Sequence, residues 1–314
     1  MDFVIAAVLP LGAGIREFHL RRTDGAPPPD WRPGSHIVLS FASGTGRRFA
    51  NRYSLVGAPG TAGMYRIAVQ REERGNGGSK CLHEELGPGS PVGVEGPFDD
   101  FPLAPVPAGR AILVAGGIGI TPLVSMAHAL HAAGKPFALH YLAGRRDRLV
   151  LLEELAALGG SLSPHVSEEA GRVDLAGLLA PWQPGDACHA CGPAPLLQAL
   201  AAAAEALGWP ADALRVESFG RRPLPEDAPL TVELALSGTT VDVPPGGSIL
   251  DALIAADAFV SWDCKRGECG NCYTRVLDGT PLHRDVCLTP AMRAEGMCTC
   301  VSWAAPPGRL RLEL

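Results

Sequence analysis

The sequence predicts a multidomain protein: an antiparallel β-barrel, then a parallel α/β sheet, then a small cysteine-rich module. Three observations indicate this order. Short β-like runs between Gly and Pro turns fill residues 1–103, strands alternate with Ala/Leu-rich helices over 104–219, and closely spaced cysteines occur within 230–314. The polar, proline-rich stretch 220–229 is expected to be a linker. We therefore expect three domains with these boundaries.

The composition excludes several classes of protein. The 314 residues are 46% hydrophobic and include 38 Gly and 29 Pro, which suits two or three cores joined by many turns. A formal charge of −6, with no stretch that concentrates Lys and Arg beside aromatics, argues against nucleic acid as a partner. The apolar run 3–11 lacks a cationic flank and is too short to cross a bilayer, so we expect a first strand and no membrane partner. Nine cysteines without a disulfide-framework spacing favour a reducing compartment, the cytoplasm.

In the first domain, the runs 36–41 and 65–69 have the composition of strands. Between them, the segment 51–55 (Asn-Arg-Tyr-Ser-Leu) places an aromatic ring and a hydroxyl at the end of a strand, where a flat ring system can stack and be hydrogen-bonded. The segment 74–79 precedes a helical pattern that includes Leu82. Its amides form a candidate anion site, and a flexible loop is the alternative.

In the second domain, the continuous apolar strand 111–115 runs into the glycine turn 116–122, which opens a helix over 122–133. Amides at such a turn can receive a pyrophosphate, and Pro122 suits the first helical turn because its missing N–H costs nothing there. The turn is not a G-x-G-x-x-G fingerprint, and no Asp or Glu occurs between Gly117 and Arg146 to hold a ribose. A generic Rossmann interpretation therefore fails.

A second turn of this kind, 191–195 (Cys-Gly-Pro-Ala-Pro), follows a later strand. Two turns at the strand ends of one sheet favour a dinucleotide as ligand. Arg145, Arg146 and Arg148 follow the strand 137–143 and are candidates for contact with ribose or phosphate, with a solvated surface as the alternative.

In the third domain, 230–236 and 239–243 predict a hairpin, and Ser248 is expected to cap a short helix over 249–256. The loop after this helix contains three cysteines in the C-x4-C-x2-C spacing that binds a plant-type [2Fe–2S] cluster: Cys264, Cys269 and Cys272. A thiolate cluster needs a tight loop whose amides point at sulfur, and Gly267 and Gly270 permit such a backbone, often at positive φ.

The fourth ligand has to follow later in the chain. Cys300 is the prediction because it opens a short apolar run that we interpret as a core strand; Cys298 and Cys287 are the alternatives. A zinc site is the other interpretation of the loop. Zinc sites usually show two short Cys or His pairs, whereas only Cys269 and Cys272 have the C-x2-C form here.

Together these motifs resemble the phthalate dioxygenase reductase-like, or vanillate demethylase reductase-like, proteins of the ferredoxin-NADP reductase superfamily. The resemblance covers nearly the whole chain, in the order flavin barrel, nicotinamide domain and β-grasp-like ferredoxin. The motifs that carry it, besides the cluster cysteines, are Tyr53-Ser54-Leu55, Gly77-Gly78-Ser79, Gly116-Gly117-Ile118-Gly119-Ile120-Thr121-Pro122, Cys191-Gly192-Pro193, Glu217-Ser218-Phe219 and His283-Arg284-Asp285.

The resemblance implies roles for these residues. It implies that Ser54, Cys191 and Phe219 are catalytic, with Cys191 beside the hydride path and Phe219 near the flavin where nicotinamide enters. The residues implied at the isoalloxazine are Tyr53, Ser54 and Leu55, and those implied at the terminal phosphate of FMN, the flavin of this family, are Gly77, Gly78 and Ser79. With the turns and the arginine identified above, the candidate residues at the nicotinamide nucleotide are Gly116, Gly117, Gly119, Thr121, Pro122, Arg145, Cys191, Gly192, Pro193 and Phe219. The cluster ligands would be Cys264, Cys269, Cys272 and Cys300, while His283, Arg284 and Asp285 would shape the cluster module or be purely structural.

One position departs from the family pattern R-x-Y-S, because Asn51 stands where the arginine is expected and Arg52 follows it. Arg52 is the candidate to reach the FMN phosphate, although adjacent strand residues point to opposite faces, so only a bulge or a different path allows it.

The implied activity is that of an NADH-dependent reductase that takes a hydride onto FMN and passes single electrons through the cluster to a Rieske-type oxygenase. NADH is the family's usual donor, and NADPH is the alternative that the missing acidic residue leaves open. The alternatives are a reductase for a di-iron or P450 oxygenase and a non-catalytic iron–sulfur redox sensor. Several reductases of the former kind place the ferredoxin first, unlike this chain.

Overall fold

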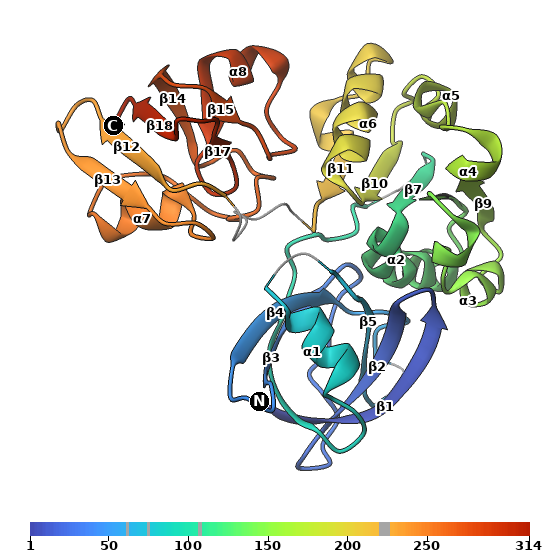
Figure 1. Ribbon diagram of the computed structural model, residues 1–314. Coiled ribbons are helices and arrows are strands. Elements are labelled where there is room, and N and C mark those ends of the chain that lie inside the picture. Colours follow the sequence, from blue (N-terminus) through green and yellow to red (C-terminus); the bar gives the residue numbers. More distant parts are fainter. Residues whose placement is uncertain (61–62, 74–75, 106–108, 220–226) are drawn as a thin grey trace. The chain divides into compact units, whose positions relative to one another are not determined.

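The computed structural model describes residues 1–60, 63–73, 76–105, 109–219 and 227–314, which form two compact units (Figure 1). Unit 1 comprises Met1–Gly192 and Ala199–Glu217, and unit 2 comprises Pro193–Gln198 and Ser218–Leu314. Most of the expected linker 220–229 lies outside the described residues. The boundaries that we expect between the three domains therefore stay predictions. No described helix has both the length and the apolar character needed to cross a membrane.

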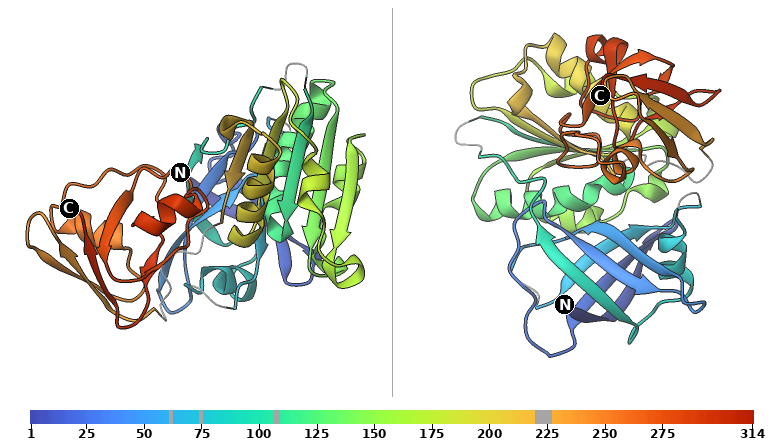
Figure 2. Two further views of the ribbon diagram at one scale, coloured as in Figure 1. Left: turned by 90° about the horizontal axis from the view of Figure 1, so that it is seen from above. Right: turned by 90° about the vertical axis from the view of Figure 1, so that its left-hand side faces the viewer.

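Unit 1 begins with the predicted antiparallel sheet, in the strand order β4-β3-β6-β1-β2-β5. Its strands are β1 (Asp2–Gly12), β2 (Ile15–Arg22), β3 (His36–Ala42), β4 (Arg48–Ser54), β5 (Tyr65–Gln70) and β6 (Pro91–Phe98), and helix α1 (Gly78–Glu84) lies between β5 and β6. The two outer strands meet through an antiparallel bridge between Leu55 and Ile67, and Val56 N–H donates to Arg66 C=O at 2.9 Å. The sheet is therefore closed into a barrel (Figure 2).

Buried and more exposed residues alternate along these strands because one face of each strand points into the barrel interior. Side chains of one face, among them Phe3, Ile5, Phe18, Leu39 and Ile67, form one apolar cluster. The intervening residues are more exposed, as a period of two requires.

The second half of unit 1 is a parallel sheet in the order β11-β10-β7-β8-β9. Its strands are β7 (Ala111–Gly116), β8 (Phe137–Ala143), β9 (Ser161–Val166), β10 (Ala187–Cys191) and β11 (Leu214–Glu217). Its helices are α2 (Ile120–Ala132), α3 (Leu152–Ala156), α4 (Ser167–Ala170), α5 (Leu175–Leu179) and α6 (Ala194–Ala206), which both units share. All six residues of β7 are buried, as expected for the central strand of a parallel sheet.

Unit 2 contains a mixed sheet in the order β13-β12-β18-β14-β16. Its strands are β12 (Leu230–Leu234), β13 (Thr240–Val243), β14 (Tyr273–Asp278), β16 (Gly296–Cys298) and β18 (Arg309–Leu312), and β15 (Pro281–Leu282) pairs with β17 (Trp303–Ala304). Its helices are α7 (Ile249–Ala255) and α8 (Pro290–Glu295). The central pair β12–β18 is parallel and its neighbours are antiparallel, which is the predicted β-grasp-like arrangement.

Two local predictions in unit 2 are confirmed and one is wrong. The hairpin forms as β12 and β13, and Ser248 caps α7 by accepting a hydrogen bond from the Asp251 amide at 2.9 Å. Cys300, however, lies in a turn between β16 and β17 and does not open a strand. The apolar run was misleading because Val301 is buried beneath the cluster loop and belongs to no strand.

Candidate functional site

Strand β4 carries the residues predicted to face a flavin. The Ser54 side chain is 4% exposed, and its Oγ is a buried polar atom without a hydrogen-bond partner among the described residues. Tyr53 is half-buried, and its hydroxyl accepts a hydrogen bond from Asn51 Nδ2 at 3.2 Å. Leu55 is fully buried in the barrel core, so only its backbone is available to a ligand. A buried hydroxyl that lacks a partner is costly and fits a cofactor polar atom at this place.

The loop that begins α1 lies against β4. Gly77 adopts φ +84°, and a Cβ on Gly78 would be 2.3 Å from Asn51 Nδ2. Asn76 links the two segments, because its Nδ2 donates to Asn51 Oδ1 at 2.9 Å and its Oδ1 accepts from the Gly78 amide at 2.9 Å. The structure therefore brings the predicted phosphate turn beside Asn51, the position that departs from the family pattern. Arg74 and Gly75, named with this turn, lie outside the described residues, and Ser79 Oγ accepts from the Glu72 amide.

The Arg52 side chain lies on the face of β4 opposite to that of Asn51. The β3–β4 register is continuous from Arg48 to Ser54, without a bulge, so Arg52 and Asn51 point to opposite faces. Arg52 instead lies 3.9 Å from an Asp100 carboxylate oxygen. An arginine that lies beside the α1 turn in the described part of the chain is Arg47, whose Nη1 is 3.9 Å from the Cβ position of Gly77. Arg47 was not predicted as a site residue because it precedes the strand and belongs to no motif.

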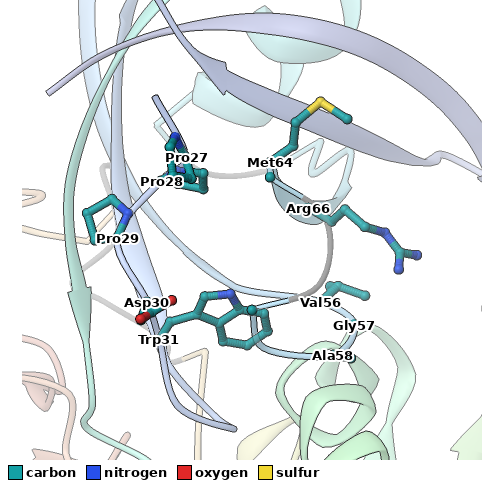
Figure 3. A pocket seen from close by; sticks show the side chains of 12 residues that line it. Pro27, Pro28, Pro29, Asp30, Trp31, Val56, Gly57, Ala58, Met64 and Arg66 are labelled. Atoms are coloured by element: carbon teal, nitrogen blue, oxygen red, sulfur yellow. The ribbon is translucent and has the colours of Figure 1, made fainter. Parts of the chain in front are cut away.

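A small pocket lies beside the end of β4, between the segment 27–31 and residues that follow Leu55 (Figure 3). It is lined by Trp31, Val56 and Arg66, among others, and has a volume of about 80 Å³. Cofactor sites usually enclose roughly 300 Å³ or more. We therefore place the candidate flavin site at Ser54 and not in this pocket.

The carboxyl ends of β7 and β10 bring the two predicted nucleotide turns together. Gly117–Gly119 form a short 3₁₀ turn after β7, and α2 begins at Ile120, two residues before the expected start. A Cβ on Gly119 would lie 2.2 Å from Cys191 C=O and 2.8 Å from Gly192 N. Glycine is therefore required for the two turns to pack, as expected for adjacent parallel strands.

The other predicted nucleotide residues lie around this edge. Pro122 is in the first turn of α2, where we expected it, and the Thr121 hydroxyl donates to Ile118 C=O at 3.1 Å. Arg145 follows β8, the neighbour of β7, and its Nε donates to Asp147 at 3.2 Å. The remaining predicted residues of this group are Gly116, which ends β7, and Pro193, which precedes α6.

Cys191 ends β10 and is fully buried. Its Sγ lies 3.9 Å from a carboxylate oxygen of Glu217, the residue opposite it at the end of β11. Glu217 is 3% exposed and was not predicted as a site residue, although it stood in a motif that signalled it, Glu217-Ser218-Phe219. Phe219 is 47% exposed and belongs to unit 2, so its role at the flavin stays a prediction.

The cluster loop of unit 2 has the backbone that the spacing predicts. The Arg266 amide donates to Cys264 Sγ at 3.3 Å, and the Asn271 amide donates to Cys269 Sγ at 3.4 Å. Gly267 and Gly270 adopt φ of +71° and +77°. A Cβ on Gly267 would be 2.6 Å from the Val301 side chain, so this loop requires glycine there.

The surroundings of Cys300 fit the fourth ligand. Cys300 contacts the Cys272 thiol and the Gly267 amide and lies near Cys264, which in turn contacts Cys269. Hydrogen bonds from the Cys298 and Cys300 thiols hold the pKa of Cys272 below its usual range, against burial. Cys298, the alternative, contacts Cys272 and Cys287. In the described ranges, no three His, Cys, Asp or Glu side chains are grouped to hold a single metal ion.

The motif 283–285 is structural. The Arg284 guanidinium makes two hydrogen bonds to Asp227, at 2.6 and 2.5 Å. Asp285 is fully buried and accepts from Arg293 at 2.9 Å and from the Leu288 amide at 3.1 Å. These contacts hold the segment that lies against Gly267, which agrees with the prediction that the motif shapes the cluster module.

Comparison with known proteins agrees with this geometry. Residues 232–305 match the family model of the 2Fe-2S iron-sulfur cluster binding domain. The toluene-4-sulfonate monooxygenase system reductase subunit of Comamonas testosteroni is 37% identical over 318 residues, 99% of this chain and 98% of its own. The structure of phthalate dioxygenase reductase, described as a modular structure for electron transfer from pyridine nucleotides to [2Fe–2S], matches with a TM-score of 0.73 and 32% identity over 100% of this chain and 98% of its own. The structure of an intact type IV self-sufficient cytochrome P450 monooxygenase matches with a TM-score of 0.68 and 37% identity, over 100% of this chain and 41% of its own.

The fold and the site define an oxidoreductase in which a flavin-binding barrel, a nicotinamide-binding sheet and a [2Fe–2S] ferredoxin domain share one chain. Within that class, the chain belongs to the phthalate dioxygenase reductase-like family. Relatives in this family are reductase subunits of oxygenase systems.

Proposed function

We propose that this protein is the NADH-dependent reductase component of an oxygenase system, with FMN as its flavin and a Rieske-type oxygenase as its acceptor. The observation that carries the proposal is the group of four cysteines in unit 2. Cys300 contacts Cys272 and lies near Cys264, and backbone amides donate hydrogen bonds to the sulfurs of Cys264 and Cys269. When bound, the flavin accepts an electron pair as hydride and the cluster carries one electron at a time.

The flavin proposal rests on residues of unit 1. Ser54 Oγ, buried without a partner among the described residues, would donate a hydrogen bond to the bound flavin, and the half-buried Tyr53 would offer its ring to the flavin rings. FMN ends in a single phosphate, and the turn Gly77–Ser79 with Arg47 supplies backbone amides and one cation for it. These assignments make Arg47 the substitute for the arginine that Asn51 replaces.

The nicotinamide proposal rests on the carboxyl edge of the parallel sheet. The turn Gly117–Gly119 at the start of α2 offers amides to the pyrophosphate, and the Gly192 turn, whose amide donates to Glu217 C=O at 3.4 Å, packs against it. Cys191 and Glu217 lie at the strand ends beside these turns. NADH is preferred over NADPH because two of the three arginines that follow β8, Arg145 and Arg146, already face carboxylates. Arg145 pairs with Asp147, and Arg146 pairs with Glu169 at 2.9 Å, so neither offers an unpaired charge to a 2′-phosphate.

The acceptor proposal rests on potentials and on the family. Plant-type clusters have reduction potentials near −400 mV and Rieske centres about −150 to +300 mV, so transfer is downhill by about 250 mV or more. At about 59 mV per decade, this is over four decades of equilibrium bias. A second candidate acceptor is a P450, because the P450 monooxygenase above matches the whole of this chain in the same domain order. The domain order of this chain is therefore compatible with a P450, which is a haem protein, as the electron acceptor.

Anaerobic titration of the purified holoprotein with NADH tests the proposal, followed by absorbance and electron paramagnetic resonance, with the released flavin identified by chromatography. We expect FMN on release, bleaching of the flavin, and a reduced [2Fe–2S] signal, with NADPH much less effective. An oxidised cluster after excess NADH would reject the reductase. Subsequent stopped-flow mixing with a Rieske oxygenase or a P450 separates the two acceptors.

A further inference from the structure

Two cysteines beside the cluster loop are not needed as ligands. Cys287 Sγ and Cys298 Sγ lie 3.8 Å apart in unit 2. We propose that this pair is a peroxide-sensitive site that closes reversibly to a disulfide and changes the electronic environment of the neighbouring [2Fe–2S] cluster. The second half of the proposal rests on the proposed function; the disulfide itself does not.

The geometry favours this pair over other thiols. Cys298 is fully buried in β16, where its backbone pairs with Tyr273, and Cys287 is half-buried in the irregular segment before α8. A disulfide has an S–S bond of about 2.05 Å, so the two sulfurs must approach by about 1.8 Å. That movement falls on the irregular segment and not on the strand.

The ligand cysteines do not compete for Cys298 once the cluster is bound. Cys298 has two thiol neighbours, Cys272 and Cys287. Cys272 is an iron ligand in the proposed cluster, and Cys300, also a proposed ligand, contacts Cys272 and the Gly267 amide. Cys287 is therefore the neighbouring sulfur that stays free to react with Cys298.

The chemistry balances with a peroxide as the oxidant. The more exposed Cys287 is attacked first, since susceptibility follows exposure: its thiol and hydrogen peroxide give a sulfenic acid and water. The Cys298 thiol then displaces hydroxide from that sulfur, which forms the S–S bond and a second water. Overall, two thiols lose two electrons and two protons, and the peroxide O–O bond is reduced to two waters. A thiol reductant reverses the step.

The disulfide would act on the cluster through one hydrogen bond. In the reduced pair, the Cys298 thiol lies beside Cys272 and has a proton to donate to it. A disulfide sulfur has no proton to donate, so oxidation removes this bond. Hydrogen bonds to cluster sulfurs are among the factors that set the reduction potential of the cluster. The reduced cluster is therefore less stable after one such bond is lost. The midpoint potential is therefore expected to become more negative.

The first experiment detects the bond directly. The holoprotein is treated with stoichiometric hydrogen peroxide, free thiols are alkylated, and the protein is digested with trypsin without reduction. Trypsin separates Cys287, on the peptide 285–293, from Cys298, on the peptide 294–309. We expect these two peptides linked, with fragmentation at Thr299 placing the link on Cys298 and not Cys300, and separation after dithiothreitol. The absorbance of the cluster is recorded first, since cysteines released from a destroyed cluster pair indiscriminately.

Controls keep the proposal falsifiable. Cys287→Ser should abolish the linked peptide while the cluster absorbance remains, and the peptide containing Cys81, in unit 1, should stay alkylated in all samples. A link that appears only after cluster loss, or that joins Cys300, would overturn the site. A linked, intact protein whose cluster titrates at the same potential as the reduced form would overturn the coupling. NADH bleaching of the untreated protein reports separately on the proposed function.

Discussion

A single position in β4 decides which arginine can approach a flavin phosphate. Because strand residues alternate between faces, moving an arginine by one position moves it to the other side of the sheet. Asn51 contacts Asn76 and Gly78, whereas Arg52 lies near Asp100. Asn51 carries no positive charge, unlike the arginine of the family pattern at this position. Arg47 supplies a positive charge nearby, and its guanidinium carbon lies 5.1 Å from the centroid of the Phe49 ring. The ring holds this side chain near the α1 turn.

Arg47→Ala should therefore weaken flavin binding. A hydrogen bond to a charged group is worth about 1.5–3 kcal/mol, so we expect the flavin Kd to rise by about tenfold or more. Fluorescence titration of the deflavinated protein with FMN measures it. Arg52→Ala is the matched control and should change the Kd by less than about threefold. A larger effect at Arg52 than at Arg47 would contradict the assignment.

The cluster ligands can be distinguished at the residue scale in the same way. Cys300→Ser should lose the cluster, because a thiolate in contact with Cys272 is removed. Cys298→Ser should keep it, since serine retains a donor toward Cys272. Iron content per chain and visible absorbance report both. Retention of the cluster in Cys300→Ser would move the fourth ligand to Cys298.

At the scale of elements, one carboxylate connects the starts of two neighbouring strands. Asp186 precedes β10 and accepts hydrogen bonds from the Arg110 amide at 2.7 Å, the Arg110 Nε at 2.9 Å and the Gln183 amide at 2.9 Å. Burial alone would raise the pKa of Asp186, but these donors outweigh it and lower the pKa. Asp186 therefore stabilises the parallel sheet where β7 and β10 begin, at the ends opposite to the nucleotide turns.

Asp186→Asn should destabilise unit 1. The pKa of Asp186 is lower in the folded chain than in the unfolded chain, so its stabilisation is complete above the unfolded pKa of about 3.9 and is lost as the pH falls through the folded pKa. We expect the substitution to lower the free energy of unfolding at pH 7 by about 1.5–3 kcal/mol. Below pH 4, the free energy of unfolding of the variant should change less with pH than that of the wild type. Urea unfolding at several pH values measures both. Asp212→Asn, at an exposed carboxylate, should behave as wild type.

Elements that depend on local pattern were predictable from the sequence. The buried strand β7, the β12–β13 hairpin, the Ser248 cap and the cluster loop follow from hydrophobic runs, turn residues and cysteine spacing. Contacts that depend on register between distant strands were not. The pairing of Cys191 with Glu217 requires knowing that β10 and β11 are adjacent and in which register. The turn at Cys300 likewise depends on the close approach of Val301 to Gly267.

At the scale of the whole molecule, an ion cluster joins the barrel to the parallel sheet inside unit 1. Arg66 on β5 makes two hydrogen bonds to Glu17 on β2, at 2.7 and 3.1 Å, and two to Glu154 on α3, at 3.2 and 2.8 Å. Burial opposes ionisation of Glu154, but hydrogen bonds from Arg66 and His128 lower its pKa. Residues of both halves also share one apolar core. The flavin and nicotinamide parts are therefore one compact unit.

Arg66→Met should weaken this junction. The substitution leaves two carboxylates facing each other, one of them 3% exposed, without their shared cation. The Arg66 and Glu154 side chains are 23% and 22% exposed, so we expect the cost to be near that of one hydrogen bond to a charged group, about 1.5–3 kcal/mol. We expect a lower urea midpoint and earlier release of flavin. Arg71→Met, which removes a surface pair with Glu84, is the control and should cost less than about 1 kcal/mol. Equal midpoints for the two variants would show that the cluster does not hold the halves together.

The position of β18 has a consequence for how the protein is made. This strand comes after all other strands of unit 2, yet it lies in the middle of the sheet, between β12 and β14. Until residues 309–312 have left the ribosome, β12 and β14 each have an unpaired edge and the cysteine loop has no closed core beneath it. Domains nearer the start of a chain generally fold first during synthesis. The barrel can therefore be ready for its flavin before residues 309–312 have been translated, whereas the core beneath the cysteine loop closes only after they have.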